Sequence, residues 1–280
     1  MKKILVPTDF SEQADYAIEV AINIAKKSQA EVIVLHVVED TTVTSVHYTG
    51  DLELPNMEDR LFVVRMIEKA KKELAELENK YKNIGLKTQL RIGNPYHNIK
   101  DYINDEHFDF VVMGTKGSTG FEEFLIGSNA EKVVRHAKCP VLTIHKKATN
   151  FDFKNIVYAT ALNEGEEQCV KVVKEFQEAY DAKIHLVRIN TPNNFESDRL
   201  SLPALRKFAE KCNLKNYEVH VYNEASEEEG IIYFADYLNA DLITMATHGR
   251  TGLAHLLTGS IAEDVVNHAK RPVMTFVIDK

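Results

Sequence analysis

GTKGSTGFEEFLIGSNAEKVVRHAKCPVLT at residues 114–143 recurs as ATHGRTGLAHLLTGSIAEDVVNHAKRPVMT at residues 246–275. The two segments lie 132 positions apart without a gap, and more than half of their residues are identical. Chance would make only a few positions agree. A repeat of this kind decides the architecture, so we expect two copies of one module in this chain.

The beginnings of the two copies also match, but at a larger separation. Residues 3–9 (KILVPTD) correspond to residues 155–161 (NIVYATA), 152 positions further on. The first copy therefore carries extra residues, which we place in the polar stretch 41–57 and the helix after it. We expect a first domain at 1–147 and a second at 152–280, joined by a short polar segment.

Size and composition fit this division and exclude several classes of protein. The chain has 280 residues, 44% of them hydrophobic, and a formal net charge of −8. An acidic balance argues against a broad nucleic-acid interface, which needs clustered Lys and Arg. No apolar run is long enough to cross a bilayer or to act as a signal peptide. Three widely spaced cysteines indicate reduced thiols, so we expect a cytoplasmic protein.

Five short apolar runs alternate with amphipathic segments in the first copy. The runs that predict strands are 3–7, 31–38, 86–92, 108–113 and 140–145. The segments that predict helices follow Ser11 and cover 58–82, 94–105 and 128–137. Strands that are apolar on both faces and alternate with helices predict an α/β fold, a doubly wound, Rossmann-like parallel sheet of five strands in each copy.

Such folds bind ligands where neighbouring strands end. The first strand ends in Pro7, Thr8 and Asp9, and the fourth ends in Met113 and Gly114. A carboxylate at the end of a central strand can accept hydrogen bonds from ribose hydroxyls. The alternative for Asp9 is a charge that complements the helix beginning near Ser11.

The loop after the fourth strand has the pattern G-x2-G-x9-G-S. Glycine lets the backbone approach a ligand closely, and Gly127 and Ser128 sit where a helix begins, so their N–H groups favour a phosphate. Asn129 adds an amide and Lys116 a positive charge. The alternative is a flexible connection with ordinary capping by Ser128. The loop is neither a Walker loop nor a GxGxxG fingerprint.

Other chemistry finds less support in the sequence. None of the eleven histidines has HxxxH or HExxH spacing, so we predict no metal site formed by the protein. His136 and His268 occupy equivalent positions near a helix C-terminus, where an imidazolium would complement the dipole. No nucleophile elbow is present, and we predict no catalytic residues.

These motifs together resemble the universal stress protein family in its tandem form. The resemblance rests on PTDFS at 7–11, LHVV at 35–38, GNP at 93–95, MGTKG at 113–117, GS at 127–128 and CPV at 139–141. It covers essentially the whole chain. The G-x2-G-x9-G-[ST] pattern is that family's ATP-binding signature.

The resemblance implies an ATP site and a stress-response or regulatory role, with at most slow ATP hydrolysis. Pro7 and Thr8 would border the base and ribose, Asp9 would hold the ribose, and the Val37 backbone would contact adenine. Gly114 would lie beside the ribose, and Mg²⁺ or Mn²⁺ would bridge phosphate oxygens. The phosphates would be bound by Gly117, Gly127, Ser128 and Asn129. The last strands of the two copies would pair into a pseudo-dimer, with further homo-oligomers left open.

The second copy departs from the pattern at the ribose side. Ala161, Ala159 and Ala246 replace Asp9, Pro7 and Gly114. The phosphate-loop residues that remain form a candidate weak second site: Gly249, Gly259, Ser260 and Ile261. We therefore expect the main site in the first copy, and a second site that is empty, weak or adapted to another nucleotide-linked metabolite or a lipid. A slow metal-dependent ATPase is the other alternative.

Overall fold

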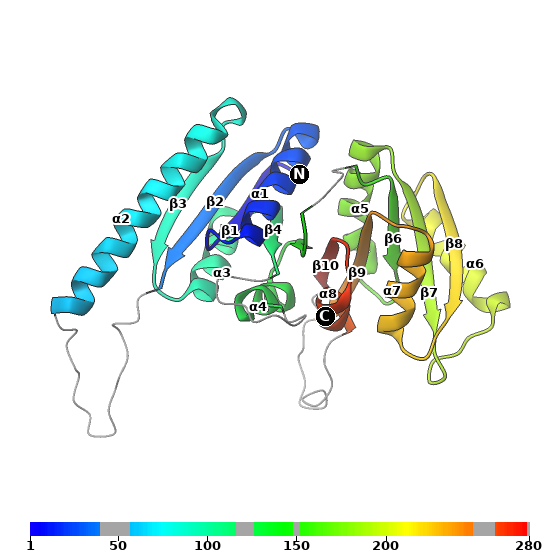
Figure 1. The fold of residues 1–280 in the computed structure, drawn as a ribbon. Helices are drawn as coiled ribbons and strands as arrows, with labels where there is room; N and C mark the ends of the chain where they lie inside the picture. The colour runs from blue at the N-terminus through cyan, green and yellow to red at the C-terminus, as the bar shows by residue number, and fades with distance from the viewer. Residues whose placement is uncertain (40–56, 116–125, 148–151, 249–260, 279–280) are drawn as a thin grey trace, which may run out of the picture.

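Ten strands form one sheet in the order β3-β2-β1-β4-β5-β10-β9-β6-β7-β8 (Figure 1). The computed structural model describes residues 1–39, 57–115, 126–147, 152–248 and 261–278. The strands are β1 (Lys3–Thr8), β2 (Glu31–Val38), β3 (Lys87–Ile92), β4 (Phe110–Gly114), β5 (Val141–Ile144), β6 (Asn155–Ala159), β7 (Lys183–Asn190), β8 (Tyr217–Asn223), β9 (Leu242–His248) and β10 (Val273–Ile278). The N-terminal half holds β1–β5 and the C-terminal half holds β6–β10.

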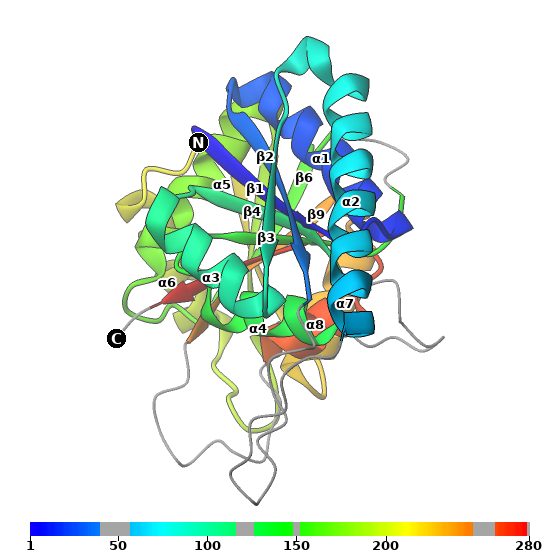
Figure 2. The ribbon, with the colours of Figure 1, turned by 90° about the vertical axis from the view of Figure 1, so that its left-hand side faces the viewer.

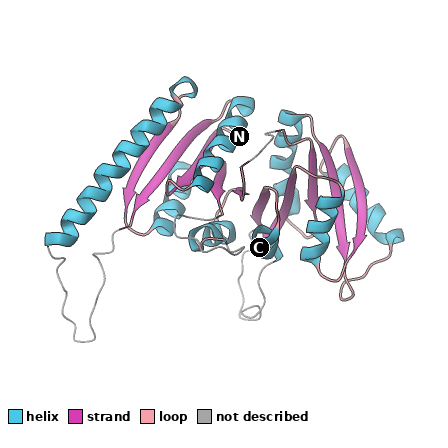
Figure 3. Ribbon diagram, in the orientation of Figure 1, coloured by secondary structure: helices cyan, strands magenta, loops and turns pink. Residues whose placement is uncertain are grey.

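Helices follow the strands in the same order in both halves, as the α/β pattern predicts. Figure 3 shows helices flanking the strands in both halves. They are α1 (Glu12–Ser28), α2 (Met57–Lys80), α3 (Pro95–Glu106), α4 (Ser128–His136), α5 (Glu166–Tyr180), α6 (Asp198–Lys211), α7 (Glu227–Tyr237) and α8 (Ile261–His268), with a 3₁₀ turn at Lys82–Ile84. Within each half all strand pairs are parallel. The predicted doubly wound, five-stranded fold is therefore confirmed for both copies.

The helices cover the two faces of the sheet in matching sets. One buried core contains residues of α1, α2, α5 and α6, and the other contains residues of α3, α4, α7 and α8. Figure 2 shows α2 and α3 on opposite sides of the β2–β3 edge. The switch between faces falls between β1 and β4 in the N-terminal half and between β6 and β9 in the C-terminal half, which is where such sheets bind ligands.

Local signals in the sequence explain the first helix. The Ala14 N–H donates to Ser11 Oγ at 3.3 Å, so Ser11 is the N-cap that the sequence predicts. The apolar stripe of α1 is buried against the sheet. The helix ends at Ser28, and the C-cap residue Gln29 adopts a left-handed conformation with φ 58°.

The extra residues of the first copy lie between its second and third strands. α2 has 24 residues, whereas its counterpart α6 has 14. The rest of the excess falls between the end of β2 at Val38 and the start of α2 at Met57, and residues 40–56 there lie outside the described part of the chain. The predicted position of the insertion is confirmed.

The two halves join through an antiparallel pair of strands, β5 and β10. Leu142 faces Met274 at the centre of the pair. Thr143 Oγ1 donates to the Val273 carbonyl at 3.0 Å, and Thr275 Oγ1 donates to the Val141 carbonyl at 3.4 Å. This reciprocity is what an approximate two-fold axis produces. The pseudo-dimer expected through the last strands is confirmed.

Aromatic side chains continue the core across this joint. Phe176 on α5 packs against Phe110 of β4, with ring centroids 5.6 Å apart, and against Phe153 and Tyr180 at 5.8 Å. The Tyr180 hydroxyl donates to Asn23 Oδ1 on α1 at 3.0 Å. Within the described residues, no helix is long and apolar enough to cross a bilayer.

Replacing Phe176 with alanine tests whether the halves share one core. Phe176 is 2% exposed, so the truncation leaves a cavity between the halves and should lower the free energy of unfolding by about 3–5 kcal/mol. Urea denaturation followed by circular dichroism measures this loss. Phe195→Ala is the control, because Phe195 is 71% exposed and its loss should cost no more than about 0.5 kcal/mol. Equal effects of the two substitutions would contradict a shared core.

Candidate functional site

The carboxyl edge of the N-terminal half brings together most of the residues that the sequence singles out. β1 lies between β2 and β4, so Thr8 and Gly114, which end their strands, lie at the same edge as Val37, the residue before the end of β2. The Met113 side chain is 5% exposed within the core, so it offers a ligand only its backbone. Lys116 and Gly117 lie outside the described residues.

The hydrogen-bonded ladder between β1 and β4 is shorter than its counterpart in the C-terminal half. Their pairing covers Ile4↔Phe110 and Leu5↔Val111. The equivalent strands β6 and β9 stay paired through Ala159↔Met245. The Thr160 N–H donates to the Val187 carbonyl on β7. Successive N–H groups of a strand point in opposite directions, so the Ala159 N–H points towards β9. Pro7 is the equivalent of Ala159 and has no N–H to give to β4. The proline thus explains why the ladder between β1 and β4 ends earlier than the ladder between β6 and β9.

A tight turn follows β1 and presents Asp9. The Phe10 N–H donates to Thr8 Oγ1 at 3.0 Å, and the Ser11 N–H donates to Asp9 Oδ1 at 3.1 Å. Phe10 adopts φ 61°, a conformation that non-glycine residues rarely take. Asp9 is exposed, so its carboxylate both closes the turn and faces solvent at the strand end. The alternative for Asp9, a local role at the start of α1, thus has structural support.

His36 braces this turn from the neighbouring strand. Its Nδ1 lies 2.8 Å from the Thr8 carbonyl oxygen, and its ring lies 4.4 Å from that of Phe10. Burial lowers the pKa of His36 and outweighs the opposing hydrogen bond to Thr8. A neutral imidazole with a proton on Nδ1 suits that contact. The sequence reasoning missed His36 because the apolar run 31–38 indicates only a buried strand.

Gly114 is required by the protein itself. A Cβ at this position would lie 2.8 Å from the carbonyl carbon of Gln13 and 2.9 Å from its oxygen. The backbone of α1 therefore passes directly over the end of β4. This close approach of the backbone is enough to require glycine at position 114, with or without a ribose beside it.

Helix α4 begins at the same edge, with Gly127 as its N-cap residue and no side-chain capping bond. Ser128 is the first helical residue, so the alternative of ordinary capping by Ser128 is wrong. The Gly127 N–H donates to the Thr115 carbonyl at 2.6 Å, which commits that amide to the protein. The N–H groups in the first turn of a helix have no acceptor within that helix. Two of these groups belong to Ser128 and Asn129.

Two residues that the sequence did not single out fix this helix start. Thr115 is 2% exposed, and its N–H donates to the Ile144 carbonyl at 3.1 Å. From the other half, Asn267 on α8 accepts the Ile126 N–H on its Oδ1 at 2.9 Å. Arg135 on α4 also forms an ion pair with Glu263 on α8, at 2.6 Å. The end of the glycine loop is therefore held by both halves. The repeat alone could not reveal this, because position 267 is Arg135 in the first copy.

In the C-terminal half, a different carboxylate accepts the backbone hydrogen bond of the equivalent turn. Ala161 replaces Asp9, and Glu166 on α5 takes over its bond by accepting the Asn163 N–H on Oε1 at 3.0 Å. Glu166 also accepts the Thr160 hydroxyl, the counterpart of Thr8. The side chain of Glu166 is inside the protein, where the residue is 2% exposed.

The start of α5 differs accordingly from that of α1. α1 begins nine residues after the start of β1, whereas α5 begins eleven residues after the start of β6. Gly165, with φ 92°, packs against β10, because a Cβ there would lie 2.6 Å from Ile278 Cγ2. Ala246 holds the position of Gly114. Gly249, Gly259 and Ser260 lie outside the described residues, and Ile261 is 40% exposed at the first turn of α8.

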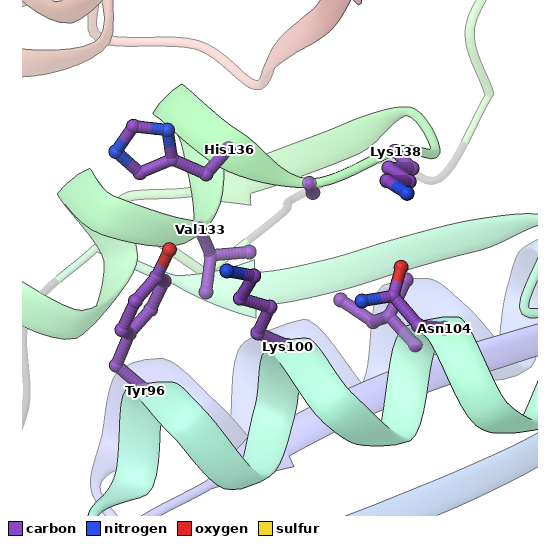
Figure 4. A pocket seen from close by; sticks show the side chains of 8 residues that line it. Tyr96, Lys100, Asn104, Val133, His136 and Lys138 are labelled. Atoms are coloured by element: carbon purple, nitrogen blue, oxygen red, sulfur yellow. The ribbon is translucent and has the colours of Figure 1, made fainter.

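A small cleft lies between α3 and α4 (Figure 4). It is lined by Tyr96, Lys100, Asn104, Val133, His136 and Lys138, among others, and its volume of about 10 Å³ suits roughly one water molecule. Burial lowers the pKa of His136, and Arg135 and Lys100 lower it further. An imidazolium at His136 is therefore disfavoured, which contradicts the dipole interpretation for this residue. His268 instead contacts Glu228, with Nδ1 2.5 Å from Oε1.

Comparison with known proteins places this geometry in one family. The model of the universal stress protein family matches residues 1–145 and again residues 152–276. The universal stress protein Slr1230 of Synechocystis is 26% identical over 99% of this chain and 100% of its own length. The universal stress protein MJ0531 of Methanocaldococcus jannaschii is 35% identical over 52% of this chain and 82% of its own length. A universal stress protein from Archaeoglobus fulgidus has the same fold, with a TM-score of 0.77, 22% identity and 98% of each chain covered.

Gly114→Ala tests whether the glycine is needed without any ligand. The added methyl group would overlap the Gln13 backbone, so we expect the nucleotide-free protein to lose about 1–3 kcal/mol of unfolding free energy. Urea denaturation measures this loss. The reverse change, Ala246→Gly, should cost less than about 1 kcal/mol, since only backbone entropy changes. A Gly114→Ala variant as stable as the wild type would show that the glycine is kept for a ligand alone.

Proposed function

The chain belongs to the universal stress protein family, and from this premise we propose that it binds ATP through its N-terminal half and serves a stress-response role. One observation carries the proposal. The carboxyl edge of the N-terminal half presents an exposed Asp9 after β1 and, after β4, a helix start without a side-chain cap. In the C-terminal half, strand pairing continues to Ala159 and Glu166 occupies the turn.

The phosphate side of the proposed site is the start of α4. Uncapped N–H groups at a helix N-terminus carry a partial positive charge and point towards an anion. Ser128 adds a hydroxyl and Asn129 an amide, while Gly127 supplies the turn rather than its own N–H. Gly117 and Lys116 complete the proposed loop. Mg²⁺ or Mn²⁺ would be held by the phosphates and would neutralise their charge.

The ribose side of the proposed site is the turn after β1. Asp9 is oriented by the Ser11 N–H, so its carboxylate is positioned before a ligand arrives. Pro7 and Thr8 would border the base and ribose, and the Val37 backbone would reach adenine from the next strand. Preorganisation of this kind favours binding. The proposal is for binding rather than turnover.

The rest of the proposal follows from the repeat. Residues 1–147 and 152–280 would act as two domains, consistent with the two matched segments of the family model. Cys139 and Cys169 are buried and all three thiols are free, which suits a reducing compartment such as the cytoplasm. The internal carboxylate of Glu166 disfavours a second nucleotide at the end of β6.

Two measurements test the proposed function. Denaturing the purified protein should release adenine nucleotide that chromatography can identify. In ATP titrations of nucleotide-free protein, Asp9→Ala should weaken binding by about one to two orders of magnitude, because a hydrogen bond to a charged group is lost. Calorimetry gives the affinity.

Two further variants separate the ligand role of Asp9 from its role in the turn. Asp9→Asn can still accept the Ser11 N–H, so it should keep wild-type stability while binding ATP more weakly. Asp101→Ala, at an exposed position on α3, should change neither stability nor affinity. If all four proteins bind ATP equally well, the ribose assignment is wrong.

A further inference from the structure

Three side chains with metal-binding atoms converge at the outer edge of the C-terminal half. His185 lies on β7, and Glu218 and His220 lie on β8. The His185 Nδ1 and His220 Nε2 atoms are 3.3 Å apart. Glu218 Oε2 lies 3.7 Å from each of these two nitrogens. Two imidazoles and a carboxylate thus point to one small volume.

The strand register builds this cluster. In the parallel β7–β8 pair, His185 is the direct partner of Glu218, and His220 is two residues further along β8. Alternate residues of a strand share a face, so all three side chains project towards the layer that contains α7. The ring of Phe234 on α7 packs 5.1 Å from that of His220 and limits its movement.

Surrounding groups hold the ligand atoms in place. Lys183 Nζ donates to Glu218 Oε1 at 2.5 Å, which leaves Oε2 turned towards the imidazoles. The side chain of His185 is 7% exposed, whereas that of Glu218 is 50% exposed. The cluster is therefore anchored in the sheet and open to solvent at the β8 edge. Burial lowers the pKa of both histidines, which favours the neutral form that ligates metals.

We propose that His185, Glu218 and His220 form a binding site for a divalent transition-metal ion, with Zn²⁺ as the reference ion. Bonds of about 2.0–2.1 Å in a tetrahedral site place ligand atoms roughly 3.3–3.4 Å apart, close to the observed separations. Imidazole nitrogens favour zinc and its neighbours, whereas Mg²⁺ and Ca²⁺ prefer oxygen. Three protein ligands at a solvent-open edge leave a fourth position for water or a partner's side chain.

The site belongs to the C-terminal half alone and lies apart from the nucleotide edge. In the N-terminal half, the same register positions hold Ile33, Lys87 and Gln89, which cannot form an equivalent set. His185 and Glu218 lie near the amino ends of their strands, whereas the proposed nucleotide site is at the carboxyl ends of β1 and β4. A simple hydrogen bond between the two histidines would explain why their nitrogens lie close together. It would not explain why the Glu218 oxygen lies at the same distance from both nitrogens.

Zinc titration of the metal-free, nucleotide-free full chain tests the proposal. Calorimetry and native mass spectrometry should show one Zn²⁺ bound per chain with the highest affinity. His220→Gln and Glu218→Gln should each weaken this binding at least tenfold, since each removes one of three ligands. Co²⁺ bound at the site should give visible absorption bands of a low-symmetry, four-coordinate ion, and these bands should vanish in both variants.

His268→Gln is the matched control. His268 also contacts a carboxylate in the same half, Glu228, but forms no third contact of this kind among the described residues. Its replacement should leave zinc affinity within about twofold of the wild type. Circular dichroism of the metal-free variants checks that they fold. If His220→Gln does not fold, Glu218→Gln, at an exposed position, still tests the proposal. Absence of stoichiometric zinc binding, or an affinity equal to that of the wild type in both ligand variants, would overturn the proposal.

Discussion

The antiparallel pairing of β5 with β10 is the interaction on which the rest of the structure depends. Without it, each half would end in an open strand of apolar residues, a surface prone to aggregation. The pair instead makes one ten-stranded sheet, and the buried hydroxyls of Thr143 and Thr275 each bond the opposite strand. The same joint brings α4 and α8 together, so that Asn267 holds the backbone at Ile126. The end of the glycine loop is thus in direct contact with the other half.

A duplicated module has been held together by this joint while its two carboxyl edges diverged. The two turns require the same hydrogen bond, and the N-terminal half supplies Asp9 where the C-terminal half supplies Glu166. Proline at position 7 ends strand pairing early, whereas Ala159 lets it continue. The C-terminal half keeps the fold but has Ala161 in place of the exposed aspartate. Its distinctive polar cluster lies instead at the amino ends of β7 and β8.

Most of the fold follows from the sequence because the repeat, the apolar runs and the cap at Ser11 are local signals. The predicted strand 31–38 coincides with β2, and the strand pairing between the halves follows from the family resemblance. The candidate site is less predictable, because its constraints are tertiary. From the sequence, Gly114 indicates a ligand nearby. In the structure, the Gln13 backbone occupies the space beside it. His185 and His220 are 35 residues apart, and only the register of two parallel strands brings them together.

The central claim is that one of the two homologous edges binds nucleotide. Native mass spectrometry of the full, nucleotide-free chain, titrated with ATP and Mg²⁺, counts the occupied sites directly. A single ATP per chain, persisting as the concentration rises well beyond saturation, is the predicted result. Two ATP molecules bound with similar affinity would contradict the account, because the C-terminal edge would then bind nucleotide without an aspartate in its turn.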